Sequence, residues 1–393
     1  MLLYIHVPFC TQKCAYCAFY SVPLRGAAGQ GADAWQFLSR FPETVIKELQ
    51  FQRQQHGSAE ITSIFFGGGT PSLLPPSAVQ AILQATTDSF AISADVEVSM
   101  EANPISALAP GWLQGVRAAG VTRLSLGVQS LDAEALRLLG RLHSADEAVQ
   151  AVKAARAAGF ASLGLDLIWG VPRWASQHGA PGNVPRWLAT LQAALDLEPD
   201  HISAYNLTLE QGTTLASLVA TGQSLLPSES EEKEMYLEGI ALMEKQGLVQ
   251  YEVSNFARPG HECRHNLGYW QGLDYLGLGP SAVSCMGHVR KTNEPDLAAW
   301  DRQVTATGQA DAAVEPLSPT VRLEEKLMLG LRTKKGLNLA EWEQESGISL
   351  PAPLLRALHE AGYSTFEAGH LALTPLGMLL SNSIIAALLE CME

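Results

Sequence analysis

The 393-residue sequence lacks a long apolar run, an excess of positive charge and an abundance of cysteine. No apolar stretch reaches the ~18 residues that a membrane-spanning helix needs. The formal net charge is −14, from 26 Lys and Arg against 40 Asp and Glu. This balance argues against non-specific nucleic-acid binding, which relies on basic surface. The chain opens without the charged and apolar regions of a secretory signal, so we expect a cytoplasmic protein.

The six cysteines are unevenly spaced. Three of them, Cys10, Cys14 and Cys17, fall within eight residues, and the others are scattered over the second half of the chain. Such scattered cysteines do not form the framework of a disulfide-rich fold, and they indicate a reducing compartment.

The clustered cysteines follow an apolar, strand-forming run that ends at Pro8. We therefore expect a buried strand with the cysteines on the loop at its C-terminal end. A structural zinc site would need a fourth ligand, and the next histidine along the chain is His56. A four-iron cluster can use three thiolates and leave one iron open for a ligand. The alternative is three unlinked buried thiols.

Short apolar runs alternate with amphipathic stretches over the first 225 residues. The predicted strands are Leu2–Val7, Ile61–Phe66, Val96–Met100, Arg123–Val128, Leu163–Trp169 and His201–Asn206. The predicted helices are Trp35–Gln55, Ser77–Phe90, Gly111–Ala119, Ser144–Ala158 and Trp187–Leu197. This alternation predicts an α/β fold of parallel βαβ units, an incomplete (β/α)6 barrel with its site at the C-terminal ends of the strands. Two long loops, Val22–Ala34 and Pro172–Pro185, are expected to be surface insertions over the barrel mouth.

The pattern changes after residue 225. An acidic helix is predicted over Ser228–Gln246, followed by a glycine- and aromatic-rich stretch over 251–288. Further helices are predicted at Arg322–Leu331, Leu339–Glu345 and Pro353–Ala361, then a hairpin at Thr365–Leu373 and a last helix. We expect a barrel core over 1–225, a barrel-covering segment over 226–300 and a smaller, mainly helical, winged-helix-like domain over 301–393. Because the chain is acidic, a packing or partner role for this domain is favoured over nucleic-acid binding.

Glycine and polar residues stand at the ends of the predicted strands. The segment FGGGTP, residues 66–71, follows the second strand, and its glycines would let a ligand approach the backbone, although a plain turn would also explain them. Glu101 ends the third strand, and we expect it to point into the barrel mouth rather than to cap a turn. Asp166 lies within the apolar fifth strand, where an unpartnered carboxylate would be costly, and Arg141 is a candidate partner for a carboxylate.

A second cluster of polar and aromatic residues lies at 264–270, which reads RHNLGYW. An imidazole can ligate haem iron, and aromatic rings can stack on a flat macrocycle. His261 and Cys263 are close enough in sequence to be alternative ligands. A packed turn with a hydrogen-bonded histidine is the structural alternative.

The spacing C-x3-C-x2-C, with Tyr16 before the last cysteine, resembles the signature of radical S-adenosylmethionine (SAM) proteins. The flanking IHVPFC and CAF resemble the oxygen-independent coproporphyrinogen III oxidase group of that superfamily. The resemblance implies a [4Fe–4S] cluster held by Cys10, Cys14 and Cys17, with SAM on the open iron. It also implies SAM or nucleoside contacts at Tyr4, Tyr16, Gly68, Gly69, Thr70, Glu101, Gln129, Arg141, Asp166, Thr208 and Val283.

Within this group the sequence resembles the haem chaperone branch. The dehydrogenase branch has a fourth cysteine two residues after the third, where this sequence has Phe19, and an extension before the first strand. The HNxxYW pattern is typical of the chaperone branch and implies haem contacts at His265, Asn266, Tyr269 and Trp270. The resemblance thus implies a chaperone that passes haem to an acceptor protein, such as a respiratory enzyme. The alternative is oxidative decarboxylation of coproporphyrinogen III.

Overall fold

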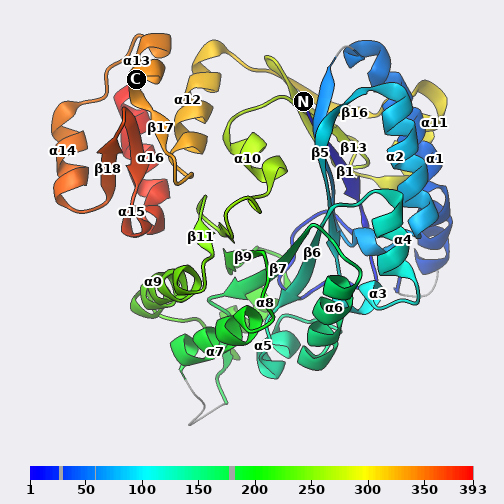
Figure 1. Cartoon of the computed structure of the whole chain (residues 1–393), viewed down its shortest axis with the longest axis horizontal. Coiled ribbons are helices and arrows are strands. Elements are labelled where there is room, and N and C mark those ends of the chain that lie inside the picture. Colours follow the sequence, from blue (N-terminus) through cyan, green and yellow to red (C-terminus); the bar gives the residue numbers. More distant parts are fainter. Residues whose placement is uncertain (26–29, 58, 177–181, 393) are drawn as a thin grey trace.

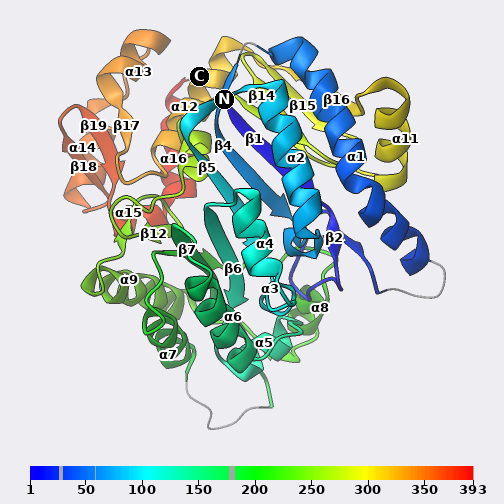
Figure 2. The same cartoon turned by 45° about the vertical axis from the view of Figure 1, so that its right-hand side comes forward.

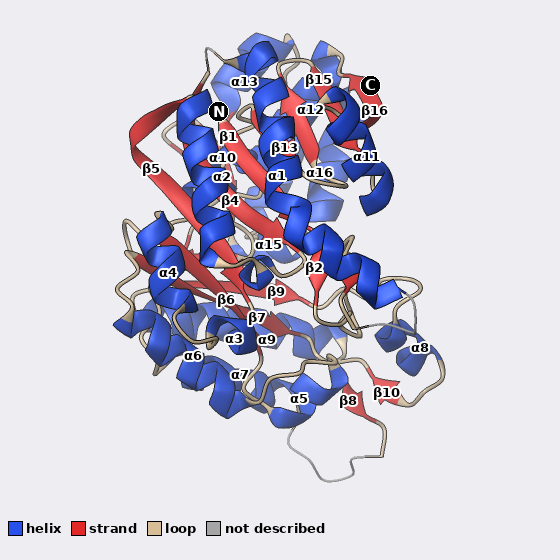
Figure 3. Ribbon diagram, turned by 90° about the vertical axis from the view of Figure 1, so that its right-hand side faces the viewer, coloured by secondary structure: helices blue, strands red, loops and turns tan. Residues whose placement is uncertain are grey.

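The computed structural model describes residues 1–25, 30–57, 59–176 and 182–392. In this part of the chain, one sheet of twelve strands dominates, in the order β11-β12-β9-β7-β6-β5-β4-β1-β13-β14-β15-β16. Helices α1, α2, α4 and α6 lie along its outer face (Figures 2 and 3). A smaller unit, built from the last part of the chain, stands beside the sheet (Figure 1).

Six neighbouring strands of the sheet are parallel. They are β1 (Leu2–Val7), β4 (Glu60–Gly68), β5 (Ala91–Ala102), β6 (Arg123–Gln129), β7 (Ser162–Trp169) and β9 (His201–Asn206). The helices that return the chain between them are α1 (Gln30–His56), α2 (Pro76–Ser89), α4 (Trp112–Ala119), α6 (Ala145–Ala157) and α7 (Asn183–Leu195). The predicted incomplete (β/α)6 barrel is confirmed, and the C-terminal ends of its strands meet at one edge of the sheet.

Strand β1 shows why the sequence folds this way. Leu3, Ile5 and Val7 are fully buried, and the strand is paired in parallel with both β4 and β13 (Tyr275–Leu278). A parallel strand covered on both faces has a continuous apolar sequence. Burying each such side chain contributes roughly 1.5–3 kcal/mol.

Shorter elements join the barrel strands. These are β2 (Phe9–Cys10), β3 (Val22–Pro23), η1 (Pro71–Leu73), α3 (Pro104–Ala107), α5 (Ala133–Leu138), β8 (Arg173–Trp174), α8 (Thr214–Ala220) and β10 (Ser224–Leu225). The two predicted loops are partly ordered by them, because β3 pairs with β2 and β8 pairs with β10. Residues 30–34 and 183–185 of these loops are helical, and residues 26–29 and 177–181 lie outside the described residues.

The sheet continues beyond the barrel at both edges. Strands β11 (Val249–Gln250) and β12 (Asn255–Ala257) extend it antiparallel beside β9, after helix α9 (Glu229–Lys245). Strands β13, β14 (Val283–Met286), β15 (Val289–Asn293) and β16 (Asp311–Pro316) form the other edge, with α11 (Leu297–Thr307) packed on α1. Because residues 301–316 belong to this layer, we place the start of the C-terminal unit after Pro316 rather than at residue 301.

The C-terminal unit has the predicted helices and hairpin. It contains α12 (Pro319–Gly330), β17 (Leu337–Asn338), α13 (Leu339–Ser346), α14 (Ala352–Glu360), β18 (Ser364–Glu367), β19 (His370–Leu373), α15 (Pro375–Leu379), α16 (Ser381–Leu389) and η2 (Glu390–Met392). Its three strands pair in the order β17-β19-β18. The buried Trp342 of α13 donates its indole N–H to the Leu323 carbonyl of α12 at 3.0 Å, which fixes these two helices together. Among the described residues, no helix is both long and apolar enough to cross a membrane.

Candidate functional site

The three clustered cysteines lie on the loop that leaves β1, as predicted. All three are half-buried free thiols. The sulfur of Cys10 accepts a hydrogen bond from Thr70 Oγ1 at 3.4 Å, and that of Cys14 accepts one from Arg141 Nη1 at 3.3 Å. Burial raises the pKa of Cys10 and of Cys17, and the negative charge of Cys14 raises both further. The thiols are therefore close enough to act as one group.

The donor set suits a multi-iron cluster better than a single ion. Three thiols fall one ligand short of the four that a closed structural zinc site needs. In a four-iron cluster each thiolate binds a different iron, so the sulfurs are spaced more widely than around one ion. Arg141 and Thr70 supply hydrogen bonds to two of the sulfurs, which stabilises thiolate charge. The site thus fits a [4Fe–4S] cluster on Cys10, Cys14 and Cys17.

The glycine segment at the end of β4 packs tightly against the start of the cysteine loop. A Cβ on Gly68 would lie 2.6 Å from the His6 ring, and a Cβ on Gly69 would lie 2.7 Å from the Phe9 carbonyl oxygen. Gly68 also has a φ of +107°, which favours glycine. The Gly69 N–H donates to the Val7 carbonyl at 2.8 Å. Only glycine fits at positions 68 and 69. The next residue, Thr70, then lies beside Cys10.

The carboxylate of Glu101, at the end of β5, is largely shielded from solvent. It accepts a hydrogen bond from the Gly68 N–H at 3.2 Å. Burial raises its pKa to about 8, and the negative charge of Asp166 adds to the shift. A cationic group bound beside it would restore the charged carboxylate. The geometry therefore fits an ammonium group, such as the one SAM carries.

A second group of predicted residues surrounds Arg141. Its Nη2 donates to the Gly127 carbonyl at 2.9 Å, and its buried Nε has no partner among the described residues. Gln129, the last residue of β6, has a φ of +64°, and its amide lies over Gly127. The half-buried Tyr16 lies near the Arg141 charge, and desolvation raises the pKa of its hydroxyl. Asp166 accepts from Ser125 Oγ at 2.9 Å, and burial raises its pKa.

A cavity of about 900 Å³ opens between the barrel mouth, α10 (Arg264–Trp270) and α12. Ligand pockets typically measure about 300–1,000 Å³, so the space accommodates a large ligand. Predicted residues that line it are Tyr4, Gly68, Glu101, Val283, Asn266, Tyr269 and Trp270. The cysteine sulfurs do not line it, but Phe19 and Tyr20 of the same loop do. Thr208 is exposed after β9 and lies outside the lining.

The HNxxYW segment forms the short helix α10, where the sequence predicted either a haem-binding cluster of side chains or a packed turn. The carboxylate of Glu97 on β5 accepts hydrogen bonds from the backbone N–H groups of Arg264 and His265, at 3.2 and 3.3 Å. The thiol of Cys263 also contacts Glu97, at 3.5 Å. Neither Cys263 nor His261 lines the large cavity. Glu97 thus fixes the start of α10 so that its later residues face the cavity.

His265 is held inside the barrel wall. Its side chain is 1% exposed, and Nδ1 lies 2.8 Å from Ser63 Oγ. Burial lowers its pKa to about 3, which keeps the imidazole neutral. It borders a separate inner chamber of about 150 Å³, which also includes Asp166, and not the large cavity. Haem ligation by His265 stays a prediction.

Several cavity residues were not found from the sequence. Tyr205 at the end of β9 has 43% of its side chain accessible, and its strand-end position was the available signal. Glu252, Cys285, Arg290, Arg322 and Glu325 also line the cavity. These five come from a turn, two strands and a helix that meet only after folding, so no spacing in the sequence reveals them.

Comparisons with known proteins agree with this architecture. The radical SAM superfamily matches residues 4–177, and the HemN C-terminal domain matches residues 317–380. The chain also aligns as a whole, with a TM-score of 0.79, to the solved structure of coproporphyrinogen III oxidase (HemN) from Escherichia coli. That alignment covers 100% of this chain and 89% of the other, at 24% identity, and it shows the shared fold. The fold and the cysteine loop thus define a radical SAM protein.

Sequence relatives narrow the family. The chain is 37% identical to the mitochondrial radical S-adenosyl methionine domain-containing protein 1 of Bos taurus, over 100% of this chain and 88% of the relative. It is 34% identical to heme chaperone HemW of Mycobacterium tuberculosis, over 98% and 94%, and 32% identical to heme chaperone HemW of Escherichia coli, over 98% and 96%. The chain belongs to the HemN/HemW family of radical SAM proteins. Membership of this superfamily implies a [4Fe–4S] cluster and SAM.

Proposed function

We propose that this protein is a haem chaperone, which binds haem in the large cavity and passes it to an acceptor protein. The observation that carries the proposal is the cavity itself, about 900 Å³ in volume and lined on one side by Asn266, Tyr269 and Trp270 of α10. A porphyrin is flat and largely apolar, and aromatic side chains favour stacked or edge-on contacts with such a ring. Relatives that bear the name heme chaperone HemW align with this chain over nearly its whole length, and this similarity supports the same proposal.

The cluster and SAM would occupy the neighbouring barrel mouth. Cys10, Cys14 and Cys17 would hold the cluster, and the Gly68–Thr70 segment with Glu101 would hold the amino end of SAM. A reduced cluster held there would be the source of one electron for SAM. Glu101 and Gly68 border the haem cavity as well as the SAM site, so the two ligands would lie side by side. Haem binding would then respond to whether SAM is bound.

The proposed location in the cell is the cytoplasm, because the cysteine loop must keep its thiols reduced. The proposed acceptor is a haem-requiring protein such as a respiratory enzyme. The acidic chain would approach a basic surface on that acceptor, since complementary charge speeds association.

The alternative is oxidative decarboxylation of coproporphyrinogen III, which would use the same cavity for a tetrapyrrole. Phe19 occupies the position where the resembling dehydrogenases have their fourth cysteine, and it is 70% exposed at the cavity. A phenyl ring can contact a macrocycle but cannot ligate iron or transfer a proton. The phenyl ring at this position therefore favours haem binding over oxidative decarboxylation of coproporphyrinogen III.

The experiment that tests the proposal compares two tryptophan variants in a haem titration followed by the Soret band. Trp270→Ala removes an aromatic ring from the cavity, whereas Trp35→Ala removes one that is 54% exposed on α1. We expect Trp270→Ala to weaken haem affinity by about tenfold, as losing one aromatic contact of about 1.4 kcal/mol would. Trp35→Ala should bind as the wild type does. Equal affinities in all three proteins would place haem outside this cavity.

A further inference from the structure

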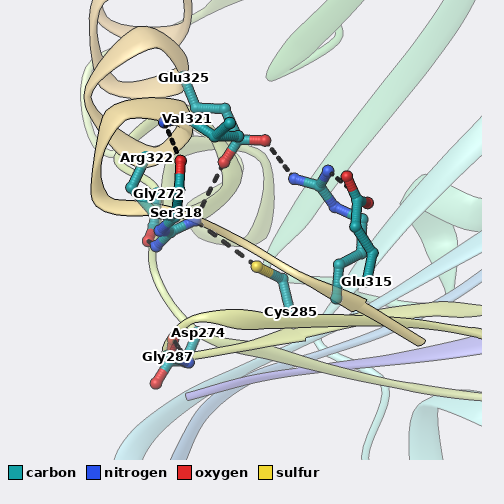
Figure 4. Close-up of polar contacts among 10 residues, drawn as sticks. Gly272, Asp274, Cys285, Gly287, Glu315, Ser318, Val321, Arg322 and Glu325 are labelled. Carbon is teal, nitrogen blue, oxygen red and sulfur yellow. Dashed lines mark hydrogen bonds and ion pairs between the residues drawn. The ribbon is translucent and has the colours of Figure 1, made fainter.

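Two arginines from distant parts of the chain meet on the cavity wall opposite the barrel mouth. Arg290 belongs to β15 and Arg322 to α12, and both form ion pairs with the carboxylate of Glu325 on α12. The Arg322 Nη1 to Glu325 distance is 3.2 Å. Figure 4 shows the guanidinium of Arg322 between the carboxylate of Glu325 and the sulfur of Cys285 on β14, which lies 3.5 Å from Arg322 Nη1. All four side chains line the 900 Å³ cavity.

The charges in this cluster do not balance within the cavity. Among the described residues that line the cavity, Arg290 and Arg322 carry the positive charge, and Glu325 is the one acid beside them. Arg290 has a second partner, Glu315, at 3.3 Å, but that carboxylate is 58% exposed and does not line the cavity. The other acids of the lining, Glu101 and Glu252, belong to the barrel side, where burial raises the pKa of each. The wall formed by β15 and α12 therefore holds the two arginines of the described lining, with the carboxylate of Glu325 between them.

The arginines retain capacity for another anion. Each guanidinium offers five N–H donors in a planar fork that matches a carboxylate. Arg322 uses its donors on Glu325, Cys285 and the Gly272 carbonyl, and Arg290 uses its donors on Glu315 and Glu325. The contacts to a thiol and to a half-exposed acid are weak and replaceable. Both side chains are also partly accessible, at 29% for Arg290 and 26% for Arg322.

Apolar side chains separate these arginines from the barrel mouth. Met328 and Leu329 of α12 continue the wall beyond Glu325, and Trp270 and Leu273 face the same space. A ligand that is flat and apolar with carboxylates at one edge would match this arrangement from end to end.

We propose that Arg290 and Arg322 form a clamp for the two propionate carboxylates of the porphyrin, so that the opposite edge of the macrocycle points toward Glu101 and the SAM site. This inference rests on the proposed haem-binding function and adds the orientation of the ligand. Glu325 acts as the internal counter-ion that the propionates displace.

The test combines protein variants with changed ligands. Haemin and haemin dimethyl ester, whose carboxylates are methylated, are titrated into the wild type and into Arg290→Gln/Arg322→Gln. We expect the double variant to bind haemin at least about tenfold more weakly, the loss of one charge-assisted contact of about 1.4 kcal/mol. The dimethyl ester should bind both proteins with about the affinity that the double variant shows for haemin. Arg137→Gln, which removes an arginine that is 68% exposed on α5, is the matched control and should change nothing.

A third variant separates a ligand clamp from a structural ion pair. Glu325→Gln removes the internal competitor and leaves both arginines in place, so it should tighten haemin binding and leave the affinity for the ester unchanged. A structural role predicts instead that Glu325→Gln weakens both ligands. The wild-type comparison of haemin with its ester needs no variant, so it gives an answer even if the double variant does not fold.

The outcomes distinguish this inference from the proposed function. If the wild type binds haemin and its ester equally, or if the double variant binds haemin as the wild type does, the clamp is wrong and haem binding stands. If the wild type binds neither ligand, the haem-binding function itself is wrong.

Discussion

The guanidinium of Arg141 lies 3.3 Å from the sulfur of Cys14, although 127 positions separate the two residues in the sequence. The contact ties the cysteine loop to the segment after α5, and through the Gly127 carbonyl to the end of β6. Arg141, from the middle of the barrel, would thus stabilise the charge of a cluster held by the cysteine loop near the start of the chain.

Arg141→Gln should therefore weaken retention of the cluster. A hydrogen bond to a charged group contributes about 1.5–3 kcal/mol, so we expect at least about tenfold faster loss of iron and sulfide after anaerobic reconstitution. Arg137→Gln, four residues earlier and exposed, is the control and should keep its cluster as the wild type does. Equal rates of cluster loss in all three proteins would show that the Arg141 contact has no such role.

Gly69→Ala should destabilise the protein and disturb the cysteine loop. Its new Cβ would lie within 3.0 Å of the backbone at Val7, Pro8 and Phe9, so the backbone must shift. Such overpacking costs about 1–3 kcal/mol, measurable as a lower midpoint of urea unfolding. The control is Gly182→Ala, where the nearest atom to a Cβ is at 3.8 Å. An unchanged midpoint for Gly69→Ala would contradict the close packing described.

The stability of the apoprotein should depend on pH through Glu101. Its pKa rises from 4.5 in the unfolded chain to about 8 in the folded protein, because burial and Asp166 disfavour the charged form. The protonated carboxyl therefore favours folding most below pH 4.5, and this contribution is lost as the pH rises toward 8.

Glu101→Gln carries no such titration. The unfolding temperature of the variant should improve relative to that of the wild type between pH 5 and pH 8, measured on protein without cluster or SAM. Titrating groups that do not interact with Glu101 cancel in the comparison, whereas the coupled Asp166 contributes to the same difference. A difference that stays constant over this range would mean that Glu101 is not perturbed as described.

Glu97→Ala should loosen α10. The substitution leaves the backbone N–H groups of Arg264 and His265 without their acceptor, and an unsatisfied buried donor, here that of His265, costs about 1–3 kcal/mol. We expect a lower unfolding temperature together with weaker haem binding. Glu134→Ala on α5, an exposed carboxylate paired with Arg137, should alter neither property. If a folded Glu97→Ala protein bound haem with normal affinity, the position of α10 would not contribute to haem binding.

The barrel was predictable because its strands are continuous apolar runs bounded by turn residues. The predicted strands Leu2–Val7 and His201–Asn206 match β1 and β9 to the residue, whereas β5 begins five residues before the predicted start. That early part, Ala91–Asp95, has one large apolar residue, Ile92, and is partly exposed, so it carries little apolar signal. The helix α10 was missed because its seven residues are too few to show a helical period.

The candidate site also contains residues that a local sequence pattern predicts and residues that only the folded structure brings together. Cys10, Gly68 and Glu101 could be predicted as site residues because each lies at or shortly after the end of a strand, where parallel barrels place their functional side chains. No sequence pattern predicted the cluster of Arg290, Arg322 and Glu325, because these residues meet only when α12 packs beside β15. His265 was found by its motif, but its burial against Ser63 depends on β4, which no local pattern reveals.

The central claim is that the protein binds haem without converting a porphyrinogen. The most direct measurement is a haem titration of the anaerobically reconstituted wild type, followed by the Soret band, beside an incubation with coproporphyrinogen III, SAM and a reductant. The account predicts stoichiometric haem binding and unchanged coproporphyrinogen in the tetrapyrrole extract. Conversion of coproporphyrinogen without haem binding would contradict it and would establish the oxidative decarboxylase instead.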